Sequence, residues 1–467
     1  MQNFAMKSNS KWSDFYTRSE MIINSKIKLE YTDKELEALA EKKRIYINNL
    51  PDTLKMSSNC KYISLDGSPD NDGSSPESAW DSLATLENNS AMLKPGDVVL
   101  FRRGDIFRGN VVAVSGVSYG AYGEGEKPRI YGSTRDYIND QWYQTDDGLW
   151  TLDVEFPADV GNIIFDSGKA VGVKRINRAD IKNSFDFWCD HENNNKVFIK
   201  LEHNPKEVFK SIEIAHNLWL FRLNRGTNNV NIENIAFGYC GGHGVRMTGS
   251  DNVTVQGCEF AFIGGCFLTE YKDGTVRYGN AVEVMYHGKN ITVKDCIAHQ
   301  IYDSGITHQG YGEYCAENLF FEENLLEYCG MGSIEYWLGK NSKCKNIFYK
   351  NNIMRFAGYG FGGIQRPDKN MSAHIQSNGN CINECENFNI ENNIFELSSY
   401  DLVNAQSRAG TFPTFKGNTY IQEENGRLGS YSDNIDCFFD SNVKDTIIVS
   451  WGDKMAKICS SKILRKE

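Results

Sequence analysis

The sequence lacks the features that mark membrane, exported and disulfide-bonded proteins. Its longest apolar runs, such as "DVVLF" and "NIIF", are far shorter than the roughly 18 to 20 residues that cross a bilayer. Residues 1–30 contain no basic segment followed by a hydrophobic one, which is the pattern of an export signal. The thirteen cysteines are scattered, odd in number and without metal-ligand spacing, which favours buried thiols. We therefore expect a cytoplasmic protein without metal ligands, the alternative being a secreted protein whose leader has been trimmed.

Positive charge is also scarce. The formal net charge is −11, so a role in binding nucleic acid has no electrostatic support. Long-range repulsion disfavours polyanionic substrates such as pectate or alginate, whereas a neutral glycan would meet no such barrier. Core-forming residues are plentiful, at 40% hydrophobic and 12% aromatic, which predicts a folded chain over most of its length.

A repeat runs through the second half of the chain. Each copy begins at an asparagine, as in "NVTVQGCEF", "NITVKDCIA" and "NFNIENNIF". Apolar and polar residues alternate within each copy, a polar pair follows, and the alternation then resumes, which is typical of short strands joined by tight bends. Successive copies begin 23, 38, 28, 28 and 41 residues apart, at Asn229, Asn252, Asn290, Asn318, Asn346 and Asn387.

Coils of this length predict an all-β protein, a right-handed parallel β-helix. Equivalent side chains of successive coils would stack about 4.8 Å apart, the ordinary spacing of strands. Asparagines stacked at a bend can hydrogen-bond along the stack and accept left-handed backbone angles, while cysteines there behave as small core residues. The position six residues after each anchor holds Ile235, Cys258, Cys296, Asn324, Asn352 and Asn393.

The segments outside the repeat predict further units. The stretch "DKELEALAEKKRIYI" predicts a helix that packs on the end of the β-helix, and "QTDDGLWTLDV" predicts antiparallel strands. The loop with Asp66, Asp70 and Asp72 most simply forms turns, with calcium binding as the alternative, and we expect no other cofactor. We expect an N-terminal extension with a helix over 1–56, a cap and first coils over 57–136, an inserted antiparallel β domain over 137–218, the main β-helix over 219–423 and a C-terminal segment over 424–467.

Ligands of a β-helix bind along an outer face, where equivalent residues of successive coils line up. The strand after the second bend of each coil reads "AVEVM", "GITHQ", "SIEYW" and "GIQRP" in consecutive copies. Because side chains alternate along a strand, its second residue faces inward and its third faces outward. The predicted outward column is Arg246, Glu283, Thr307, Glu335, Gln365 and Asn404, with Gln309 and Trp337 two residues further along their strands.

This lysine-free column of carboxylates, amides and a tryptophan suits a neutral sugar. One carboxylic acid protonates a glycosidic oxygen, a carboxylate attacks or activates water, and aromatic rings stack on sugar C–H faces. We expect Glu335 to be the general acid/base, because Tyr336 and Trp337 beside it would favour its protonated form. Asp303, in the turn before the middle strand, is expected to be the nucleophile or base. Glu283 would orient the substrate or replace Asp303 in that role.

Strand spacing leaves the stereochemical outcome open. Glu283 and Glu335 stand two coils apart, roughly 9.6 Å, whereas retaining glycosidases hold their carboxyl groups about 5 to 5.5 Å apart and inverting ones about 6.5 to 9.5 Å. Asp303 belongs to the coil between them, so it can approach either glutamate closely enough for retention. The candidate catalytic set is therefore these three carboxylates.

Several other residues are expected to bind substrate. His308 and Tyr336 alternate inward, and they reach the groove only if their strands end early. The segments Leu268–Asn280 and Arg366–Asn380 enter between coils and should form walls of the groove that set specificity. The substrate-binding candidates are Gln309, Trp337, Gln365, Arg246, His308, Tyr336 and Arg366.

With these motifs the chain resembles carbohydrate-active β-helix proteins whose early coils are interrupted by an antiparallel domain. It is similar to glycoside hydrolase family 120, the β-xylosidases, and family 141, which includes xylanases and α-L-fucosidases, over about residues 60–425. The resemblance rests on "YISLDGSPDNDG", "LKPGDVVLFRRGD", "QWYQTDDGLWTLDV" and "IYDSGITHQG". The xylosidase family carries an aspartate nucleophile and a glutamate acid/base on adjacent coils of the outward column. Glu335 matches the glutamate, but its neighbours are Thr307 and Gln365, so the nucleophile does not carry over by position, which favours family 141 or an unassigned relative.

We therefore expect a glycoside hydrolase that cleaves a neutral, xylo- or fuco-configured oligosaccharide. A polysaccharide lyase acting on a uronate-containing glycan, a fructan-type transglycosylase and a β-helix without catalysis are the alternatives. We expect no nucleic-acid or membrane partner, and either a monomer or a homo-oligomer.

Overall fold

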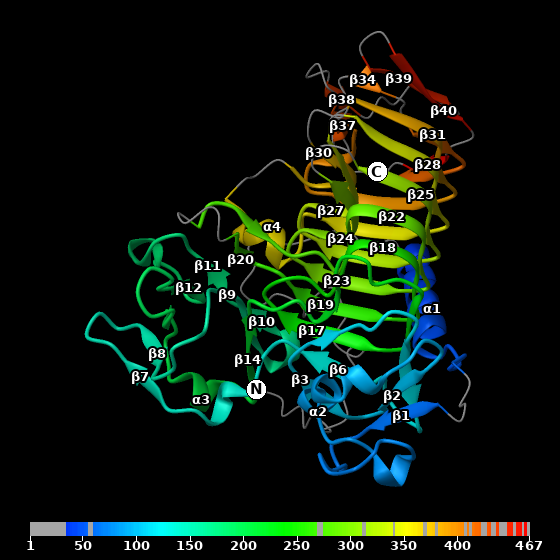
Figure 1. The fold of residues 1–467 in the computed structure, drawn as a ribbon. Coiled ribbons are helices and arrows are strands. Elements are labelled where there is room, and N and C mark those ends of the chain that lie inside the picture. The colour runs from blue at the N-terminus through cyan, green and yellow to red at the C-terminus, as the bar shows by residue number, and fades with distance from the viewer. Residues whose placement is uncertain are drawn as a thin grey trace.

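The protein is an all-β parallel β-helix, as the repeat predicts, seen here in a computed structural model. Its coils stack from the blue N-terminal cap upward, and an inserted region projects to one side (Figure 1). In the described part of the chain no helix is long and apolar enough to span a membrane. The structure describes residues 34–54, 59–268, 274–310, 314–339, 341–367, 371–378, 382–405, 409–410, 413–421, 427–430, 436–438, 446–451, 454–459 and 462–464.

Each coil contributes strands to three faces, all paired in parallel with the next coil. The first face contains β4 (Val111–Val112), β15 (Phe221–Leu223), the first halves of β18 (Val245–Gln256) and β22 (Val282–Lys294), β24 (Ser304–Gly310), β27 (Gly332–Leu338), β30 (Ala373–Asn378) and β33 (Asp401–Ala405).

The second face follows a bend within the longer strands. It contains β2 (Val98–Arg102), β5 (Ser118–Tyr122), β16 (Val230–Glu233), the second halves of β18 and β22, β25 (Cys315–Glu322), β28 (Ser342–Lys350), β31 (Ile382–Glu391) and β35 (Thr414–Lys416).

The third face closes each coil. It contains β3 (Ile106–Arg108), β6 (Arg129–Tyr131), β17 (Ala236–Cys240), β19 (Glu259–Ile263), β23 (Ile297–Ile301), β26 (Leu325–Cys329), β29 (Ile353–Ala357), β32 (Ile394–Ser398), β36 (Thr419–Ile421) and β41 (Lys462–Leu464).

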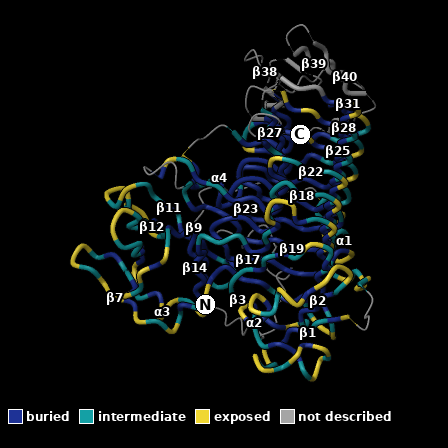
Figure 2. Tube along the Cα trace, viewed as in Figure 1, coloured by how far each residue is buried: buried dark blue, intermediate teal, exposed yellow. Residues whose placement is uncertain are grey.

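The strands at the C-terminal end continue the stack or pair as hairpins. They are β34 (Ala409–Gly410), β37 (Arg427–Ser430), β38 (Asp436–Phe438), β39 (Thr446–Trp451) and β40 (Lys454–Cys459). The interior of the coils is continuously buried, whereas exposed residues gather on the cap and the inserted region (Figure 2).

Two ladders of asparagines hold the coils in register. The anchor asparagines lie at the bend between the first and second faces, all with positive φ, and each amide bonds the amide of the preceding coil, as Asn318 does with Asn290 at 2.8 Å. The second ladder is buried between the second and third faces, where Asn352 Nδ2 donates to Asn393 Oδ1 at 2.9 Å. Here the left-handed angle belongs to the residue before the asparagine, such as Asn351. The buried ladder confirms the hydrogen bonding predicted for the sixth position, whereas the left-handed angle predicted there falls on the preceding residue. Cys258 and Cys296 are buried as expected.

Replacing one asparagine of the buried ladder should lower the free energy of unfolding far more than replacing one of the exposed ladder. Asn352→Ala deletes bonds to Asn393 and to the Phe321 carbonyl, and it removes the acceptor of the Asn324 backbone N–H. Because those groups would stay buried and unpaired, we expect a loss of about 3 kcal/mol in the free energy of unfolding, measured by urea titration. The control Asn318→Gly keeps the positive φ and should lose less than about 1 kcal/mol. Equal losses in both variants would contradict this assignment.

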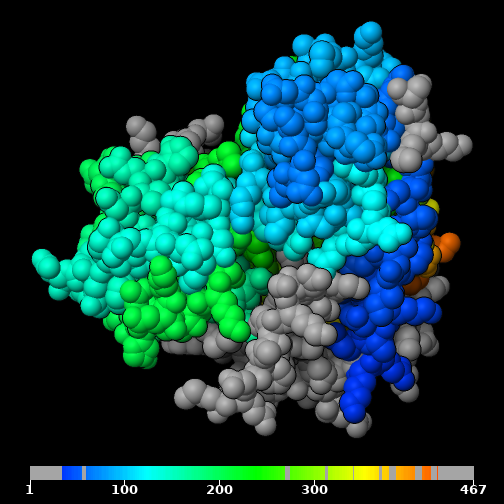
Figure 3. Space-filling view, turned by 90° about the horizontal axis from the view of Figure 1, so that it is seen from below, coloured from blue at the N-terminus to red at the C-terminus, as the bar shows by residue number. Residues whose placement is uncertain are grey.

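The N-terminal cap begins with β1 (Cys60–Ile63), which pairs with β2. The helix α2 (Leu83–Asn88) follows the glycine-rich loop, and Figure 3 shows the cap beside the inserted region when seen from this end. In the loop, Asp66 pairs with Arg102. The backbone N–H and hydroxyl of Ser74 and the hydroxyl of Ser78 hold the pKa of Asp72 at about 2. These two aspartates therefore serve turns and an ion pair. The short 3-10 helices here are η2 (Pro76–Ser78) and η3 (Ser90–Met92).

The inserted region contains a small sheet and two strands that join the β-helix. In the small sheet β7, β8, β13 and β12 pair antiparallel, and β11 adds a parallel edge. In contrast, β9 and β14 extend the third face, with β14 parallel to β17. The insertion is thus anchored in the coil stack. Its elements are η4 (Tyr137–Asn139), β7 (Trp142–Gln144), β8 (Trp150–Leu152), β9 (Val160–Phe165), η5 (Asp166–Gly168), β10 (Ala170–Val171), β11 (Val173–Lys174), η6 (Arg178–Asp180), β12 (Asp186–Cys189), β13 (Val197–Ile199), α3 (Pro205–Val208) and β14 (Ile212–His216).

The predicted N-terminal helix is α1 (Lys34–Asn48), but it does not pack on the end of the β-helix. It lies along the side of the stack instead (Figure 1). Ala40 and Ile47 cover isoleucines and a leucine of consecutive third-face strands. Arg44 pairs with Glu327 at 2.6 Å, and Arg355, almost fully buried, pairs with Glu327, Glu396 and the helix residue Glu37. The third-face strands carry apolar and charged side chains that are buried only when a helix packs over them. This explains why α1 lies along the side of the β-helix.

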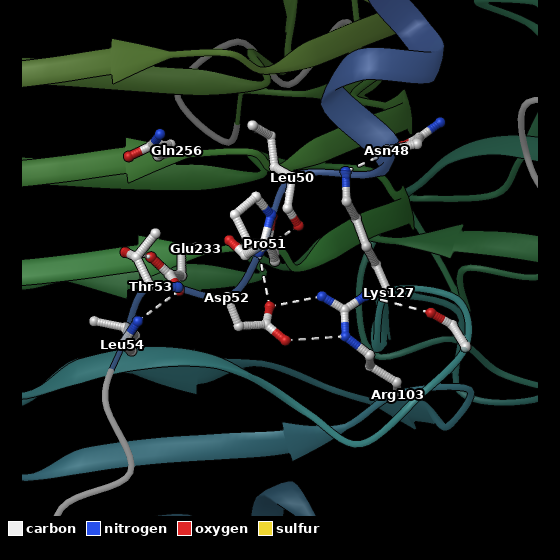
Figure 4. A network of polar contacts seen from close by, with 12 residues as sticks. Asn48, Leu50, Pro51, Asp52, Thr53, Leu54, Arg103, Lys127, Glu233 and Gln256 are labelled. Atoms are coloured by element: carbon white, nitrogen blue, oxygen red, sulfur yellow. Dashed lines mark hydrogen bonds and ion pairs between the residues drawn. The ribbon is translucent and has the colours of Figure 1, made fainter.

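The segment after α1 continues down the stack and is bonded to two coils (Figure 4). Asp52 pairs with Arg103 at 2.6 Å and accepts from the Asn234 amide at 2.7 Å. Glu233 accepts from the Leu54 backbone N–H at 2.9 Å. Lys127 donates to Asn48 Oδ1 at 3.0 Å, and burial lowers the pKa of its ammonium group.

Candidate active site

A cavity of about 580 Å³ opens on the first face. Its floor is formed by β18, β22, β24 and β27. One wall is the hairpin of β20 (Cys266–Phe267) and β21 (Arg277–Tyr278), and another is formed by Arg366 and Met371. The segments 268–280 and 366–380 therefore both contribute to the walls, as expected. Residues at the floor and walls include Asn217, Trp219, His243, Arg246, Asn280, Glu283, Asp303, Gln309, Glu335, Trp337 and Arg366.

The strand register confirms the predicted column as far as Glu335 and corrects its continuation. Arg246 lies opposite Glu283, Glu283 opposite Thr307, and Thr307 opposite Glu335. The next partner is Gln376. Gln365 is instead the last residue of the short helix α4 (Phe361–Gln365), where it is buried and accepts from the Lys174 backbone N–H. The prediction that Gln365 lies in the column and contacts substrate there is wrong.

Glu283 is held by donors from three neighbouring strands and turns. Its Oε2 lies 2.7 Å from Arg246 Nε and 3.3 Å from His243 Nε2, and Gln309 donates to Oε1. The side chain is almost fully buried on the cavity floor. An arginine, a histidine and an amide thus surround the two carboxyl oxygens of Glu283 and fix its side chain on the cavity floor.

His243 is a close neighbour of Glu283 that the sequence did not reveal. Its Nδ1 accepts from the Asn280 backbone N–H at 3.1 Å, so the ring proton is assigned to Nε2, which faces Glu283. Burial lowers the pKa of His243 to about 4, against the opposing effect of the Glu283 charge, so the ring is neutral at pH 7. The residue lies two positions before the inward-facing Val245, in the same column as Asn280 and Ser304, and extending the repeat alignment by two residues would have found it.

Arg246 and Trp219 form one end of the cavity. The Arg246 guanidinium lies 3.9 Å from the centre of the Trp219 ring, a cation–π contact that fixes the side chain, and its Nε forms an ion pair with Glu283. On the hairpin wall beside Trp219, Tyr278 donates to Asn217, and burial raises the pKa of its hydroxyl. The predicted cavity residue Arg246 is therefore in place, with Trp219 as an aromatic neighbour that sequence spacing did not indicate.

Asp303 lies at the junction of the third and first faces and is paired with Arg366. Its Oδ2 also accepts from the Gly279 backbone N–H at 3.0 Å. Arg366 was predicted to bind a substrate hydroxyl or carboxylate, whereas here its Nη1 also donates to the Tyr302 carbonyl at 3.2 Å. The pair favours an ionised Asp303 at the cavity wall.

Glu335 stands on β27, two coils from Glu283, and is almost fully buried at the cavity floor. Its Oε2 accepts from the Ser304 hydroxyl at 3.1 Å. Trp337, two residues along the same strand, lines the cavity and is partly exposed, as an aromatic platform for a ligand requires. Thr307, between the two glutamates, is fully buried.

His308 and Tyr336 do not reach the cavity, so their prediction as substrate-binding residues is wrong. Both face the interior, where their rings stack with centroids 6.2 Å apart. His308 Nε2 is bonded to the Tyr349 hydroxyl at 2.6 Å, and burial lowers its pKa to about 3. The strands continue past these residues to Gly310 and Leu338, so strict alternation keeps both side chains inside. Tyr336 therefore cannot favour protonation of Glu335 from within the cavity.

The cavity lining carries balanced formal charge. Its arginines are Arg246, Arg277 and Arg366, and its carboxylates are Glu283, Asp303 and Glu335. Within the described residues, no group of three His, Cys, Asp or Glu side chains is placed to hold a metal ion. A neutral cavity in a chain of net charge −11 lets an uncharged polar ligand enter without long-range repulsion.

Comparison with known proteins shows likeness of fold alone. No family model and no curated protein match the sequence. The structure of XylC with xylose is 8% identical, with a TM-score of 0.50 over 87% of this chain and 82% of that chain. A glycoside hydrolase is 9% identical, with a TM-score of 0.49 over 80% and 95% of the two chains. An alginate lyase from Paenibacillus sp. str. FPU-7 is 11% identical, with a TM-score of 0.40 over 75% and 89%.

Proposed function

We propose that this protein is a glycoside hydrolase that cleaves a neutral oligosaccharide in the first-face cavity. The observation that carries the proposal is the convergence of Glu283, Asp303 and Glu335, from three consecutive coils, on one cavity with Trp337 at its floor. Carboxyl groups are the groups that glycosidases use as acid, base and nucleophile. A cavity of about 580 Å³ falls within the usual range for small-molecule sites.

The contacts of the three carboxyl groups differ, and these differences support a different catalytic role for each. Asp303, beside Arg366, is the ionised group that attacks the glycosyl carbon or activates a water. Glu335 is the general acid that protonates the leaving oxygen. Glu283, fixed by Arg246, His243 and Gln309, accepts hydrogen bonds from sugar hydroxyls.

The sugar is proposed to be xylo- or fuco-configured. The resemblance of the sequence motifs to families 120 and 141 supports this choice, and the similarly folded XylC is described with xylose. The balanced charge of the cavity lining supports a neutral sugar over a polyuronate.

A panel of aryl glycosides tests the proposal. We expect release of nitrophenol from α- or β-linked xylosides or fucosides, and proton NMR of the first sugar released will assign retention or inversion. Glu317→Gln, an exposed second-face residue paired with Lys289, should keep full activity. Ultraviolet absorbance of an unsaturated uronate product, without hydrolysis of any glycoside, would establish a lyase and overturn the proposal.

A further inference from the structure

A series of buried polar contacts, three of them hydrogen bonds, links two of the cavity carboxylates. From the Glu283 side, His243 Nε2 lies 3.3 Å from Glu283 Oε2, and His243 Nδ1 accepts from the Asn280 backbone N–H. The Asn280 side-chain Oδ1 accepts from the Ser304 backbone N–H at 3.0 Å. The Ser304 hydroxyl then donates to Glu335 Oε2 at 3.1 Å. The two glutamates, which stand two coils apart, are thus set relative to one another through Asn280 and Ser304.

The third carboxylate belongs to the same junction. Asp303 precedes Ser304, and Gly279 precedes Asn280. The Gly279 backbone N–H donates to Asp303 Oδ2, and the Asp303 backbone N–H donates to the Gly279 carbonyl, both at 3.0 Å. A displacement of either dipeptide would therefore move all three carboxylates.

The linking residues are closed to solvent. Ser304 is 0% exposed, Asn280 3% and His243 4%. Because these residues are almost fully buried, the loss of one bonding partner leaves the other poorly solvated in a medium of low polarity.

We propose that Ser304 is a positioning residue that determines which oxygen of Glu335 carries the catalytic proton. This inference rests on the proposed function for the role of Glu335 as the acid. Because Oε2 accepts the Ser304 hydroxyl, the proton is carried by Oε1, and Asn280 holds the Ser304 backbone in the position that this bond requires.

The proton balance of the step is simple. The Oε1–H bond breaks, and the proton passes to the glycosidic oxygen, which leaves with the electron pair of its bond to the glycosyl carbon. The Asp303 carboxylate, or a water from which it takes a proton, forms the new bond to that carbon. Glu335 becomes a carboxylate, and the Ser304 hydroxyl stabilises the charge that develops on it.

Ser304→Ala is expected to affect catalysis and its pH dependence together. Loss of a hydrogen bond to a charged group should lower kcat by about tenfold to a hundredfold, with KM nearly unchanged. Because the hydroxyl stabilises the ionised form of Glu335, its removal should move the alkaline limb of the pH–kcat profile to higher pH. Ser304→Thr, which keeps the hydroxyl, should restore most of the rate.

Ser333→Ala is the matched control. Ser333 is also fully buried on the strand of Glu335, but its hydroxyl is bonded to His374 Nδ1 at 3.0 Å. This variant should lose stability and leave the alkaline limb in place. A Ser304→Ala enzyme with an unmoved alkaline limb, or a limb that moves equally in Ser333→Ala, would overturn the positioning role.

A readout without turnover separates this inference from the proposed function. The carboxyl carbon of Glu335 can be followed by ¹³C NMR in protein labelled at glutamate, with Glu335→Gln identifying the signal. We expect its titration midpoint to rise in Ser304→Ala. If the midpoint rises while no glycoside is hydrolysed, the coupling stands and the proposed function fails. If it stays constant, the coupling itself is wrong.

Discussion

Glu335→Gln is expected to lower kcat by about 10²- to 10⁴-fold for aryl glycosides with poor leaving groups. The amide keeps the shape of the side chain and its acceptor for Ser304, but it has no acidic proton. For a 2,4-dinitrophenyl glycoside, whose leaving group departs without protonation, the first chemical step should stay close to the wild-type rate. Pre-steady-state release of the phenol measures that step directly.

Asp303→Asn should behave differently, and the contrast assigns the two roles. Loss of the nucleophile or base affects every substrate, so the rate should fall for good and poor leaving groups alike. The variant also leaves Arg366 without its carboxylate partner, so its thermal unfolding must be recorded beside the kinetics. Asp251→Asn, paired with His287 at a partly exposed position, is the control and should keep full activity. A Glu335→Gln enzyme that loses the same factor on every leaving group would exclude Glu335 as the acid.

The protein is expected to lose stability steeply as the pH falls from about 6.5 towards 4. Five of its eight histidines are buried, and in each case burial lowers the pKa, to about 4 for His216 and His243 and to about 3 for His299, His308 and His374. Below pH 6.5 the unfolded chain binds protons that the folded chain does not, so the free energy of unfolding decreases as the pH falls. Stability from these neutral rings is fully present above pH 6.5. Each such histidine contributes about 1.4 kcal/mol per pH unit to the slope.

Urea titrations at several pH values between 7.5 and 4.5 test this linkage. His308→Phe removes one buried titrating group, so its free energy of unfolding should vary with pH by about one proton less than that of the wild type. The slope of the free energy of unfolding against pH gives the difference in bound protons between the two states. The lost hydrogen bond to Tyr349 changes the stability itself but not this slope. His203→Gln, at an exposed position, should leave the slope unchanged. A slope that is the same in His308→Phe and the wild type would contradict the buried neutral state of His308.

The coil architecture and most of the outward column could be predicted from the sequence. Both follow from the regular spacing of residues in those copies of the repeat that contain no inserted loop. Asn290, Asn318 and Asn346 are spaced by 28 residues, and strand alternation then places Glu283 and Glu335 outward and His308 inward. The inward placement of His308 followed from alternation alone, and the expectation that it turns into the groove required an early strand end that does not occur.

Gln365 was misplaced because the longest step in the repeat contains structure of its own. The apolar-polar alternation of "GIQRP" imitates a strand, but Gly362 and Gly363 allow α4 to pack against neighbouring backbone. A Cβ at Gly362 would lie 2.4 Å from the Tyr302 carbonyl oxygen, and one at Gly363 would lie 1.9 Å from that of Gly358. The approach of Gly362 to Tyr302 joins residues of different coils, 60 positions apart in the chain, and no local pattern reports such a contact.

The hydrogen-bond partners of the carboxylates also lay beyond the reach of the sequence. His243 approaches Glu283, and Trp219 approaches Arg246, only because β15 stacks beside β18 and β18 beside β22. Arg366 reaches Asp303 only because α4 returns the chain towards β23 and β24, two coils before β30. The spacing of the repeat identifies which residues line up on the outer face of the coils. The contacts that those residues make with an inserted loop depend on how that loop folds.

The position of α1 along the side of the stack has a consequence for the order in which the chain folds. The helix is synthesised before the coils that it covers, yet Glu37 bonds Arg355, which follows 318 residues later. The ion pairs of Arg44 with Glu327 and of Lys43 with Glu323 likewise join the helix to residues much later in the chain. Contacts so distant in sequence form late, because the coils that bear them must first be synthesised and stacked. We therefore expect α1 to dock only after the coils beneath it have folded. Its amides should become protected from hydrogen exchange after those of the strands that it covers.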